Sequence, residues 1–220
     1  MSESKKFAVV LAGCGVYDGA EIHEATMTLY AIALEGASYE IFAPNTPQHH
    51  VVNHLNGEDM KEERNVLVEA ARLARGNIKP LSEYNPKKFD ALIFPGGFGV
   101  AKNLCTFAFD GTSCSVNPEV ENAIKNTHAN KKPIGALCIS PVLLAKVLGK
   151  GNITIGTDSG TAQAVEQLGA KHQNTQHGQV AIDEENLLFT SPCYMLNASI
   201  VDIANDAKAV VKEMVNHIKK

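Results

Sequence analysis

The fold of this chain is decided by the stretch Pro133-Ile134-Gly135-Ala136-Leu137-Cys138-Ile139-Ser140-Pro141, where an apolar run ends abruptly at a cysteine and a helical pattern begins. A strand that turns sharply into a helix places Cys138 at the C-terminal edge of a sheet, beside a helix N-terminus. The free N–H groups and the helix dipole are expected to favour the thiolate over the thiol. Cys138 is therefore a candidate nucleophile. A buried structural cysteine is the alternative for this stretch taken alone.

Along the rest of the chain, apolar strand-like runs alternate with segments of helical periodicity. The predicted strands are Phe7–Ala12, Tyr39–Ala43, Phe89–Phe94, Pro133–Leu137 and Ile153–Gly156, with a hairpin of Gln179–Asp183 and Leu187–Thr190. The predicted helices are Ile22–Leu34, Met60–Ala74, Pro118–Ala129, Pro141–Leu148, Thr161–Leu168 and Ser199–Ile218. This alternation predicts one α/β domain over residues 1–220, with a mostly parallel sheet covered by helices on both faces.

Composition excludes several classes of function. A length of 220 residues suits one domain with a sizeable core. The net charge is −4 and no run of Lys or Arg forms a basic stripe, so we expect no nucleic-acid partner. No segment has the length of a membrane span, and the apolar run that follows the polar first residues ends at Gly13, which argues against a secretory signal.

The five cysteines are an odd number at irregular spacings, with no CxxC pair. This pattern does not match a zinc site, and we expect no metal. It predicts free thiols in a reducing compartment, most simply the cytoplasm.

Several distant segments follow predicted strands and should open onto one edge of the sheet. Gly13-Cys14-Gly15 follows the first strand, Pro95-Gly96-Gly97-Phe98-Gly99 the third, Cys138 the fourth and Cys193 the last. In open α/β sheets, ligands bind outside the carboxyl ends of the strands. The sequence therefore predicts the active site at this edge.

The glycines of the segment at 95–99 permit a close backbone approach to a ligand. N–H groups at Gly96 or Gly97, together with that of Ile139, would form an oxyanion hole for a tetrahedral intermediate. A phosphate-binding loop or a plain turn is the alternative, although the P-loop Lys and the GxGxxG pattern are both absent.

Glu24 lies about one turn into the first predicted helix, where it could face Cys138 and hold a proton. Burial at that place would raise the pKa of its carboxyl. The alternative is an ordinary acidic residue, which the helix dipole favours in a first turn. Glu21 and His23 compete for the same role, and His23 is expected to face solvent or cap the helix.

Two loops remain open in function. The long segment between Asn103 and Asn117 contains Phe107 and Phe109, and is either a lid or subunit contact over the active edge or ordinary packing. The loop Asn45–His54 holds three histidines, which are expected to form a polar rim or surface loop rather than a metal site.

Three motifs together carry a family resemblance: Gly19-Ala20-Glu21-Ile22-His23-Glu24, Pro95-Gly96-Gly97-Phe98-Gly99-Val100-Ala101-Lys102-Asn103-Leu104, and Cys138-Ile139-Ser140-Pro141. The chain resembles the class I glutamine amidotransferase-like superfamily, which includes the PfpI proteases and the Parkinson-associated deglycase. Within it, Leu11–Gly19 and Gly156-Thr157-Asp158 are similar to the ElbB subgroup. Members of that subgroup are described both as isoprenoid biosynthesis proteins with an amidotransferase-like domain and as glyoxalases.

The resemblance implies a flavodoxin-like sheet, a homodimer, and a site without a cofactor. It implies a nucleophile at Cys138, a cysteine-contacting carboxyl at Glu24, and oxyanion donors at Gly97 and Ile139. One departure is that many relatives carry a histidine about twenty residues after the cysteine, where this chain has Gly156-Thr157-Asp158. The later His172 and His177 follow another helix.

The missing histidine, and the absence of a late His-x-Glu, argue against glutamine hydrolysis and peptide cleavage, which need a general acid. We therefore expect a glutathione-independent glyoxalase that converts glyoxal, or a related small reactive carbonyl, to its hydroxy acid. One alternative is a redox or electrophile sensor with an oxidisable Cys138. The other is an amidotransferase-like subunit that needs a partner.

Overall fold

Short apolar strands form the centre of the computed structural model, which describes residues 4–218. The strands are β1 Lys6–Val10, β2 Ser38–Ala43, β3 Lys79–Pro80, β4 Ala91–Phe94, β5 Ile134–Leu137, β6 Asn152–Ile153, β7 Lys171–His172, β8 Ala181–Asp183 and β9 Leu188–Ser191. The helices are α1 Ile22–Leu34, α2 Val66–Leu73, α3 Phe107–Asp110, α4 Pro118–Ala129, α5 Pro141–Leu148, α6 Ser159–Gln167 and α7 Ile200–Ile218.

The main sheet has the order β3-β2-β1-β4-β5-β9-β8. Its strand pairs are parallel except for β8 and β9, which form the predicted antiparallel hairpin. Without the short β3, the parallel strands follow the 2-1-3-4-5 order of flavodoxin-like sheets, whose ligand site lies where the order reverses. That point falls between β1 and β4.

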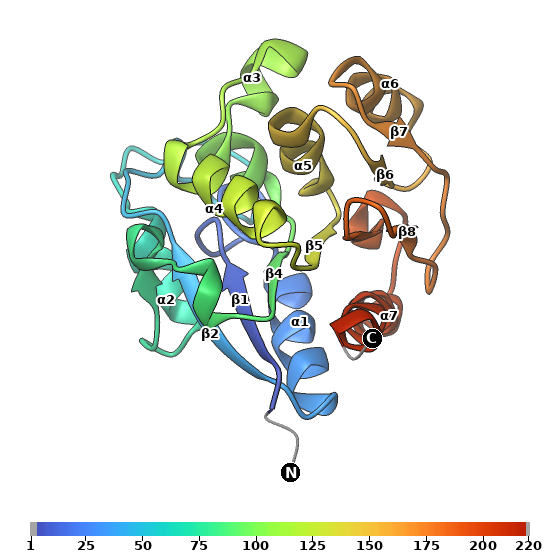
Figure 1. The fold of residues 1–220 in the computed structure, drawn as a ribbon. Helices are drawn as coiled ribbons and strands as arrows, with labels where there is room; N and C mark the ends of the chain where they lie inside the picture. Colours follow the sequence, from blue (N-terminus) through green and yellow to red (C-terminus); the bar gives the residue numbers. More distant parts are fainter. Residues whose placement is uncertain (1–3, 219–220) are drawn as a thin grey trace.

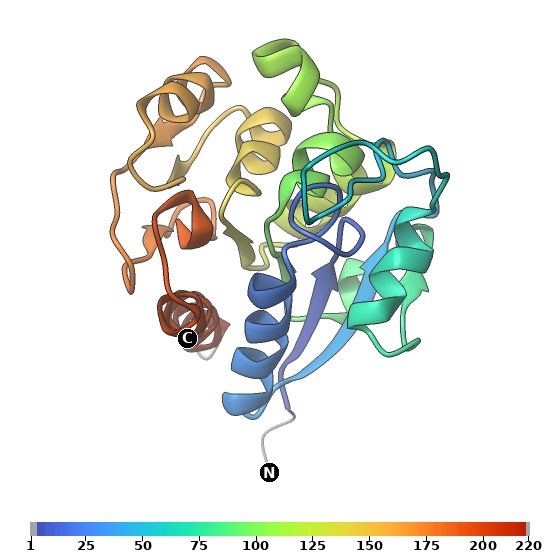
Figure 2. The same cartoon turned by 180° about the vertical axis from the view of Figure 1, so that it is seen from behind.

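Helices cover both faces of the sheet, so the predicted three-layer α/β architecture is confirmed (Figure 1). Successive side chains of a strand point to opposite faces. In β1, Val9 packs in the core that α1, α2 and α7 cover, whereas Ala8 and Val10 pack in the core that α4 and α5 cover. Figure 2 shows α1 and α7 side by side on the first of these faces.

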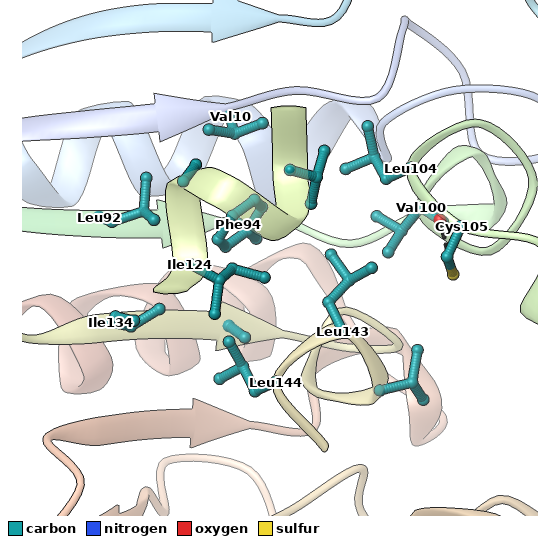
Figure 3. Packing of buried hydrophobic residues seen from close by; sticks show 14 of the residues in the cluster. Val10, Leu92, Phe94, Val100, Leu104, Cys105, Ile124, Ile134, Leu143 and Leu144 are labelled. Carbon is teal, nitrogen blue, oxygen red and sulfur yellow. Dashed lines mark hydrogen bonds between the residues drawn. The ribbon is translucent and has the colours of Figure 1, made fainter. Parts of the chain in front are cut away.

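The core under α4 and α5 extends beyond the strand ends toward the active edge. Val10, Phe94 and Ile124 meet in its centre, and Val100 and Leu104 continue it above the carboxyl ends of the strands (Figure 3). All five side chains are fully buried. This packing fixes the π-helical turn Val100–Leu104, which follows the glycine-rich segment, and so limits the movement of that segment.

Most predicted elements match the observed ones to within two residues at each end, and two differ more. The expected helix Met60–Ala74 begins only at Val66, because Oδ1 of Asn65 caps it by accepting the Val68 N–H at 3.1 Å. Met60 instead donates its N–H to the carbonyl of Val51 at 2.7 Å within a folded loop. The expected strand Ile153–Gly156 is reduced to β6. Residues 1–3, the polar start of the chain, lie outside the described residues. No helix within 4–218 is long and apolar enough to cross a membrane.

Candidate active site

Cys138 lies on the sharp turn between β5 and α5, as predicted. Its φ of 59° is in the left-handed region, which residues other than glycine rarely adopt and which is often found at functional sites. The Cys138 N–H donates to the carbonyl of Ser191 at 3.0 Å, and Oγ of Ser140 donates to the carbonyl of Pro95 at 2.8 Å. These bonds tie the turn to the segments that follow β9 and β4, and leave the cysteine 7% exposed.

Glu24 is fully buried in the first turn of α1, and its carboxyl forms a hydrogen bond with the Cys138 thiol. The N–H of Gly96 donates to its Oε2 at 3.0 Å, and the N–H of Tyr194 donates to its Oε1 at 3.1 Å. The helix is capped by Glu21, whose Oε2 accepts the Glu24 N–H at 2.7 Å. Because Glu21 fills the capping role, Glu24 is free to face the cysteine.

The pKa values of Glu24 and Cys138 are both raised, which does not fit the expectation that Cys138 rests as a thiolate. Burial raises the pKa of Glu24 to about 8, as predicted for a buried carboxyl, although N–H groups and the thiol oppose the shift. Burial, followed by the charge of Glu24, raises the pKa of Cys138 well above its usual value, against hydrogen bonds from the N–H groups of Gly97 and Ile139. The predicted preference for a resting thiolate is therefore wrong, because desolvation outweighs the backbone donors.

The glycine-rich segment allows the two reactive groups to meet. A β-carbon on Gly96 would lie 2.4 Å from Cβ of Cys138 and 2.5 Å from Oε2 of Glu24. Gly97 has a φ of 106°, and a β-carbon there would lie 2.4 Å from the backbone N of Glu21. The Gly96 N–H is already bonded to Glu24, so Gly96 positions the carboxyl instead of serving as the predicted oxyanion donor. The N–H groups of Gly97 and Ile139 face the sulfur.

A cavity of about 450 Å³ opens above the sulfur. Most of its wall is apolar, and its lining includes Val16, Phe98, Ala101, Phe107, Ile139 and Met195. Phe107 thus lines the pocket from the long segment at 103–117, whereas Phe109 packs against His49 with ring centroids 4.2 Å apart. The segment contributes both wall and ordinary packing.

Tyr194, which was not predicted from the sequence, lines the same cavity. Its hydroxyl lies 2.8 Å from Nδ1 of His23, and that nitrogen lies 3.8 Å from Oε1 of Glu21. Burial, with the nearby Glu21 and Glu24, raises the pKa of Tyr194. His23 is half exposed, as expected, but it bonds to a residue of the site. The signal that could have found Tyr194 is its place beside Cys193 after the last strand.

His172 and His177 form hydrogen bonds away from the cavity above Cys138. Nε2 of His172 accepts the N–H of Ile155 at 3.2 Å, and Nδ1 of His177 lies 2.8 Å from Oδ2 of the buried Asp206 in α7. Asp158, in the segment Gly156-Thr157-Asp158 where the resemblance led us to look for a histidine, caps α6 by accepting the Thr161 N–H at 2.8 Å. None of the three lines the cavity above Cys138.

The three histidines of the loop at 45–54 do not converge. His49 and His50 pack around Phe109, whereas His54 lies against Tyr17 and Asp18. Within residues 4–218, no group of three or more His, Cys, Asp or Glu side chains is placed to hold a metal ion.

Comparison with known proteins shows the family to which this chain belongs. A model of the DJ-1/PfpI family matches residues 14–194. The mitochondrial ES1 protein homolog of Rattus norvegicus is 47% identical over 95% of this chain and 82% of its own length. The mitochondrial glutamine amidotransferase-like class 1 domain-containing protein 3 of Homo sapiens is 45% identical over the same shares.

Solved structures with a similar fold include proteins of related description. An isoprenoid biosynthesis protein with amidotransferase-like domain from Ehrlichia chaffeensis superposes with a TM-score of 0.92 at 36% identity, covering 97% of this chain and 99% of its own. Drosophila melanogaster DJ-1beta has a TM-score of 0.56 at 17% identity, covering 99% and 95%, and supports the fold alone.

These names correct one prediction and limit another. The predicted cytoplasmic location is wrong, because the rat, human and Danio rerio relatives are all named mitochondrial. Free thiols indicate a reducing environment without naming the compartment. The curated relatives carry ES1 and amidotransferase-like names rather than ElbB, so the resemblance is confirmed at the level of the wider group. The family model and the relatives show that the chain belongs to the DJ-1/PfpI family.

Proposed function

We propose that this protein is a cysteine-dependent, glutathione-independent glyoxalase that converts glyoxal, or a related reactive carbonyl, to the hydroxy acid. The observation that carries the proposal is the hydrogen bond between the buried carboxyl of Glu24 and the thiol of Cys138, which lines a cavity. A carboxyl with a pKa of about 8 can both give and take a proton near neutral pH. This is the property that an aldehyde isomerisation requires.

The proposed route conserves atoms and electrons without a cofactor. The Cys138 sulfur bonds to one aldehyde carbon as its thiol proton passes through the Glu24 carboxyl to the carbonyl oxygen, which gives a hemithioacetal and leaves Glu24 ionised. The N–H groups of Gly97 and Ile139 stabilise the oxyanion that develops. Glu24 then removes the hydrogen of that carbon as a proton while the second carbonyl oxygen is protonated, which gives an enediol. Glu24 returns the proton to the second carbon as the hydroxyl on the first carbon loses its proton to solvent, so the second carbon is reduced and the first is oxidised to the thioester. Water cleaves the resulting thioester, releasing glycolate and the thiol.

Tyr194 and His23 offer a second proton route, in the place of the histidine that many relatives carry. The Tyr194 hydroxyl lines the cavity and is bonded to His23, which reaches solvent. We assign to Tyr194 the protonation of the second carbonyl oxygen. His23 exchanges that proton with water.

The alternative functions have weaker support. A sensor cysteine has to react from a resting thiolate, which burial and Glu24 disfavour by raising the pKa of Cys138 well above its usual value, whereas in the proposed route Glu24 takes the thiol proton as the sulfur adds. Amidotransferase-like names favour a subunit of a larger enzyme, but no late His-x-Glu is present in the sequence.

Membership in the ElbB subgroup and a role in isoprenoid metabolism are further proposals. A homodimer is also proposed, since Ile22, Tyr30 and Leu34 expose apolar surface along α1.

The test is glyoxal consumption and glycolate formation without glutathione, by the wild type and by the Cys138→Ser and Glu24→Gln variants. Both variants are expected to lose turnover. Cys14→Ser is the matched control, because Cys14 is partly exposed and does not line the cavity. Full activity in Cys138→Ser would refute the proposal, as would an inactive wild type.

A further inference from the structure

The cavity above Cys138 is larger than glyoxal requires. Its volume of about 450 Å³ lies within the roughly 300–1,000 Å³ typical of sites for drug-sized ligands. Glyoxal has only four heavy atoms and carries no apolar group. Bound at the sulfur, it would leave most of the apolar wall in contact with water.

The lining of this cavity combines polar and apolar groups. Glu21 and Tyr194 are neighbours of Glu24, which lies beside Cys138, whereas Phe98, Phe107 and Met195 belong to three separate segments of the wall. Phe98 follows the glycine-rich segment, Phe107 begins α3, and Met195 lies in the turn after β9. Two aromatic rings and a thioether form a surface suited to an aryl or alkyl group.

The side chains that line the cavity disfavour an anionic substituent. No lysine or arginine is among its lining residues within 4–218, while the Glu21 carboxyl lines it and the Glu24 carboxyl lies beside Cys138. The nearby Lys102 does not line the cavity; its Nζ donates to the Tyr17 carbonyl at 2.9 Å and lies 5.8 Å from the centroid of the Phe98 ring. A phosphate or carboxylate on the substrate would meet no positive side chain among the described lining residues and would have to leave water for an apolar wall.

We propose that the preferred substrate is a neutral 2-oxoaldehyde that bears an aryl or medium-length alkyl group on the carbon next to the aldehyde. This inference rests on the proposed function and names its substrate class. The aldehyde lies at the sulfur and the substituent contacts Phe98 and Phe107. The chemistry is unchanged: the thiol adds to the aldehyde, the hydrogen of the aldehyde carbon is transferred as a proton to the second carbon through an enediol, and water cleaves the thioester to release the 2-hydroxy acid and the thiol. Phenylglyoxal would thus give mandelate.

The size of the preference follows from buried area. Each buried methylene increases the binding constant roughly fourfold. An aryl group should therefore raise kcat/KM at least about tenfold over the value for glyoxal. The experiment compares glyoxal, methylglyoxal, phenylglyoxal and 4-carboxyphenylglyoxal, with hydroxy acid formation as the readout. Phenylglyoxal is expected to be the best substrate and its carboxy derivative at least about tenfold poorer. Cys138→Ser measures the uncatalysed reaction of the arylglyoxals, including their reaction with arginine.

Phe98→Ala is the main variant, because Phe98 is 52% exposed and its loss should not harm the core. It should reduce the ratio of phenylglyoxal to glyoxal turnover several-fold. Val68→Ala is the matched control, since Val68 is 62% exposed on α2 and remote from the cavity. Ala108 is exposed and lines the cavity, so the larger side chain of Ala108→Phe should obstruct the space for the aryl group. This variant should also reduce the ratio of phenylglyoxal to glyoxal turnover. A preference for glyoxal, or ratios that match the wild type in both cavity variants, would overturn the proposal.

A binding measurement separates this proposal from the proposed function. Acetophenone is neutral and lacks the aldehyde, so calorimetry can follow its binding to the wild type without turnover. Binding that Phe98→Ala weakens supports the ligand class even if no aldehyde is converted, a result that would refute only the glyoxalase. Absence of acetophenone binding in a protein that converts glyoxal would overturn the ligand class and leave the glyoxalase standing.

Discussion

The backbone N–H of Gly96 donates to Oε2 of Glu24 at 3.0 Å, and so joins the segment after β4 to the first turn of α1 across 72 residues of chain. The same glycine passes so close to Cys138 that no larger residue fits between the thiol and the carboxyl. The relationship explains why a glycine is needed here, and why the cysteine and the glutamate are presented to each other in a fixed geometry.

Replacement of Gly96 by alanine should therefore damage the site. The added methyl would lie 2.4 Å from Cβ of Cys138, and relief of that overlap should cost about 1–3 kcal/mol of stability. Urea unfolding measures this loss, and glyoxal turnover should fall with it. Gly160→Ala is the control, because its nearest neighbour would be 3.6 Å away and alanine favours the helix. Equal stability of the two variants would contradict the packing argument.

The raised pKa of Glu24 predicts how stability depends on pH. The pKa is about 8 in the folded state against an ordinary value of 4.5, so the folded protein binds more protons than the unfolded chain between these values. The resulting stabilisation is fully present below pH 4.5 and is lost as the pH rises through 8, with a magnitude on the order of a few kcal/mol.

Urea unfolding of the wild type and Glu24→Gln at pH 5, 6.5 and 8 isolates this effect. The stability of the variant relative to the wild type should increase with pH, because glutamine does not ionise. Glu184→Gln, at an exposed position, should follow the wild type at every pH. Parallel curves for the wild type and Glu24→Gln would show that the carboxyl is not held protonated.

Alkylation should separate the two roles of Glu24. Its negative charge raises the pKa of Cys138, so Glu24→Gln should speed the reaction of Cys138 with iodoacetamide at pH 8 severalfold. The same variant should lose glyoxal turnover, which needs the proton transfer. Cys14 is an internal control, because burial and the charges of Glu69, Arg72 and Asp18 shift its pKa, and Glu24 is not among the causes. Peptide mass spectrometry follows both thiols, and slower labelling of Cys138 in the variant would show that Glu24 activates the thiol as a base.

Tyr194→Phe tests the second proton route with little change of structure. The variant removes only the hydroxyl, and the backbone N–H that bonds to Glu24 stays in place. We expect kcat to fall by about a hundredfold, with a much smaller change in KM. Tyr30→Phe is the control, since Tyr30 is 49% exposed on α1 and does not line the cavity. Unchanged kcat in Tyr194→Phe would remove that residue from the mechanism.

Much of the fold could be predicted because its signals are local. The helices Ile22–Leu34, Pro118–Ala129 and Pro141–Leu148 have the bounds that periodicity and capping residues indicate. The start of α2 could not be predicted in this way, since Met60 continues the apolar pattern but bonds back to Val51 in a loop. Two-residue strands such as β3 and β7 carry no periodicity to detect.

The sequence by itself determined which segments meet at the active edge, because the carboxyl ends of parallel strands share one side of the sheet. It thereby indicated Cys138 and the glycine-rich segment as parts of the candidate site, whereas Glu24 entered the prediction through the resemblance of its motif to a known family. Only the tertiary structure decided the protonation of that site, because a pKa depends on burial and on neighbours from distant segments. It also decided that Tyr194 joins His23 at the cavity, since that contact spans 171 residues and no local pattern records it.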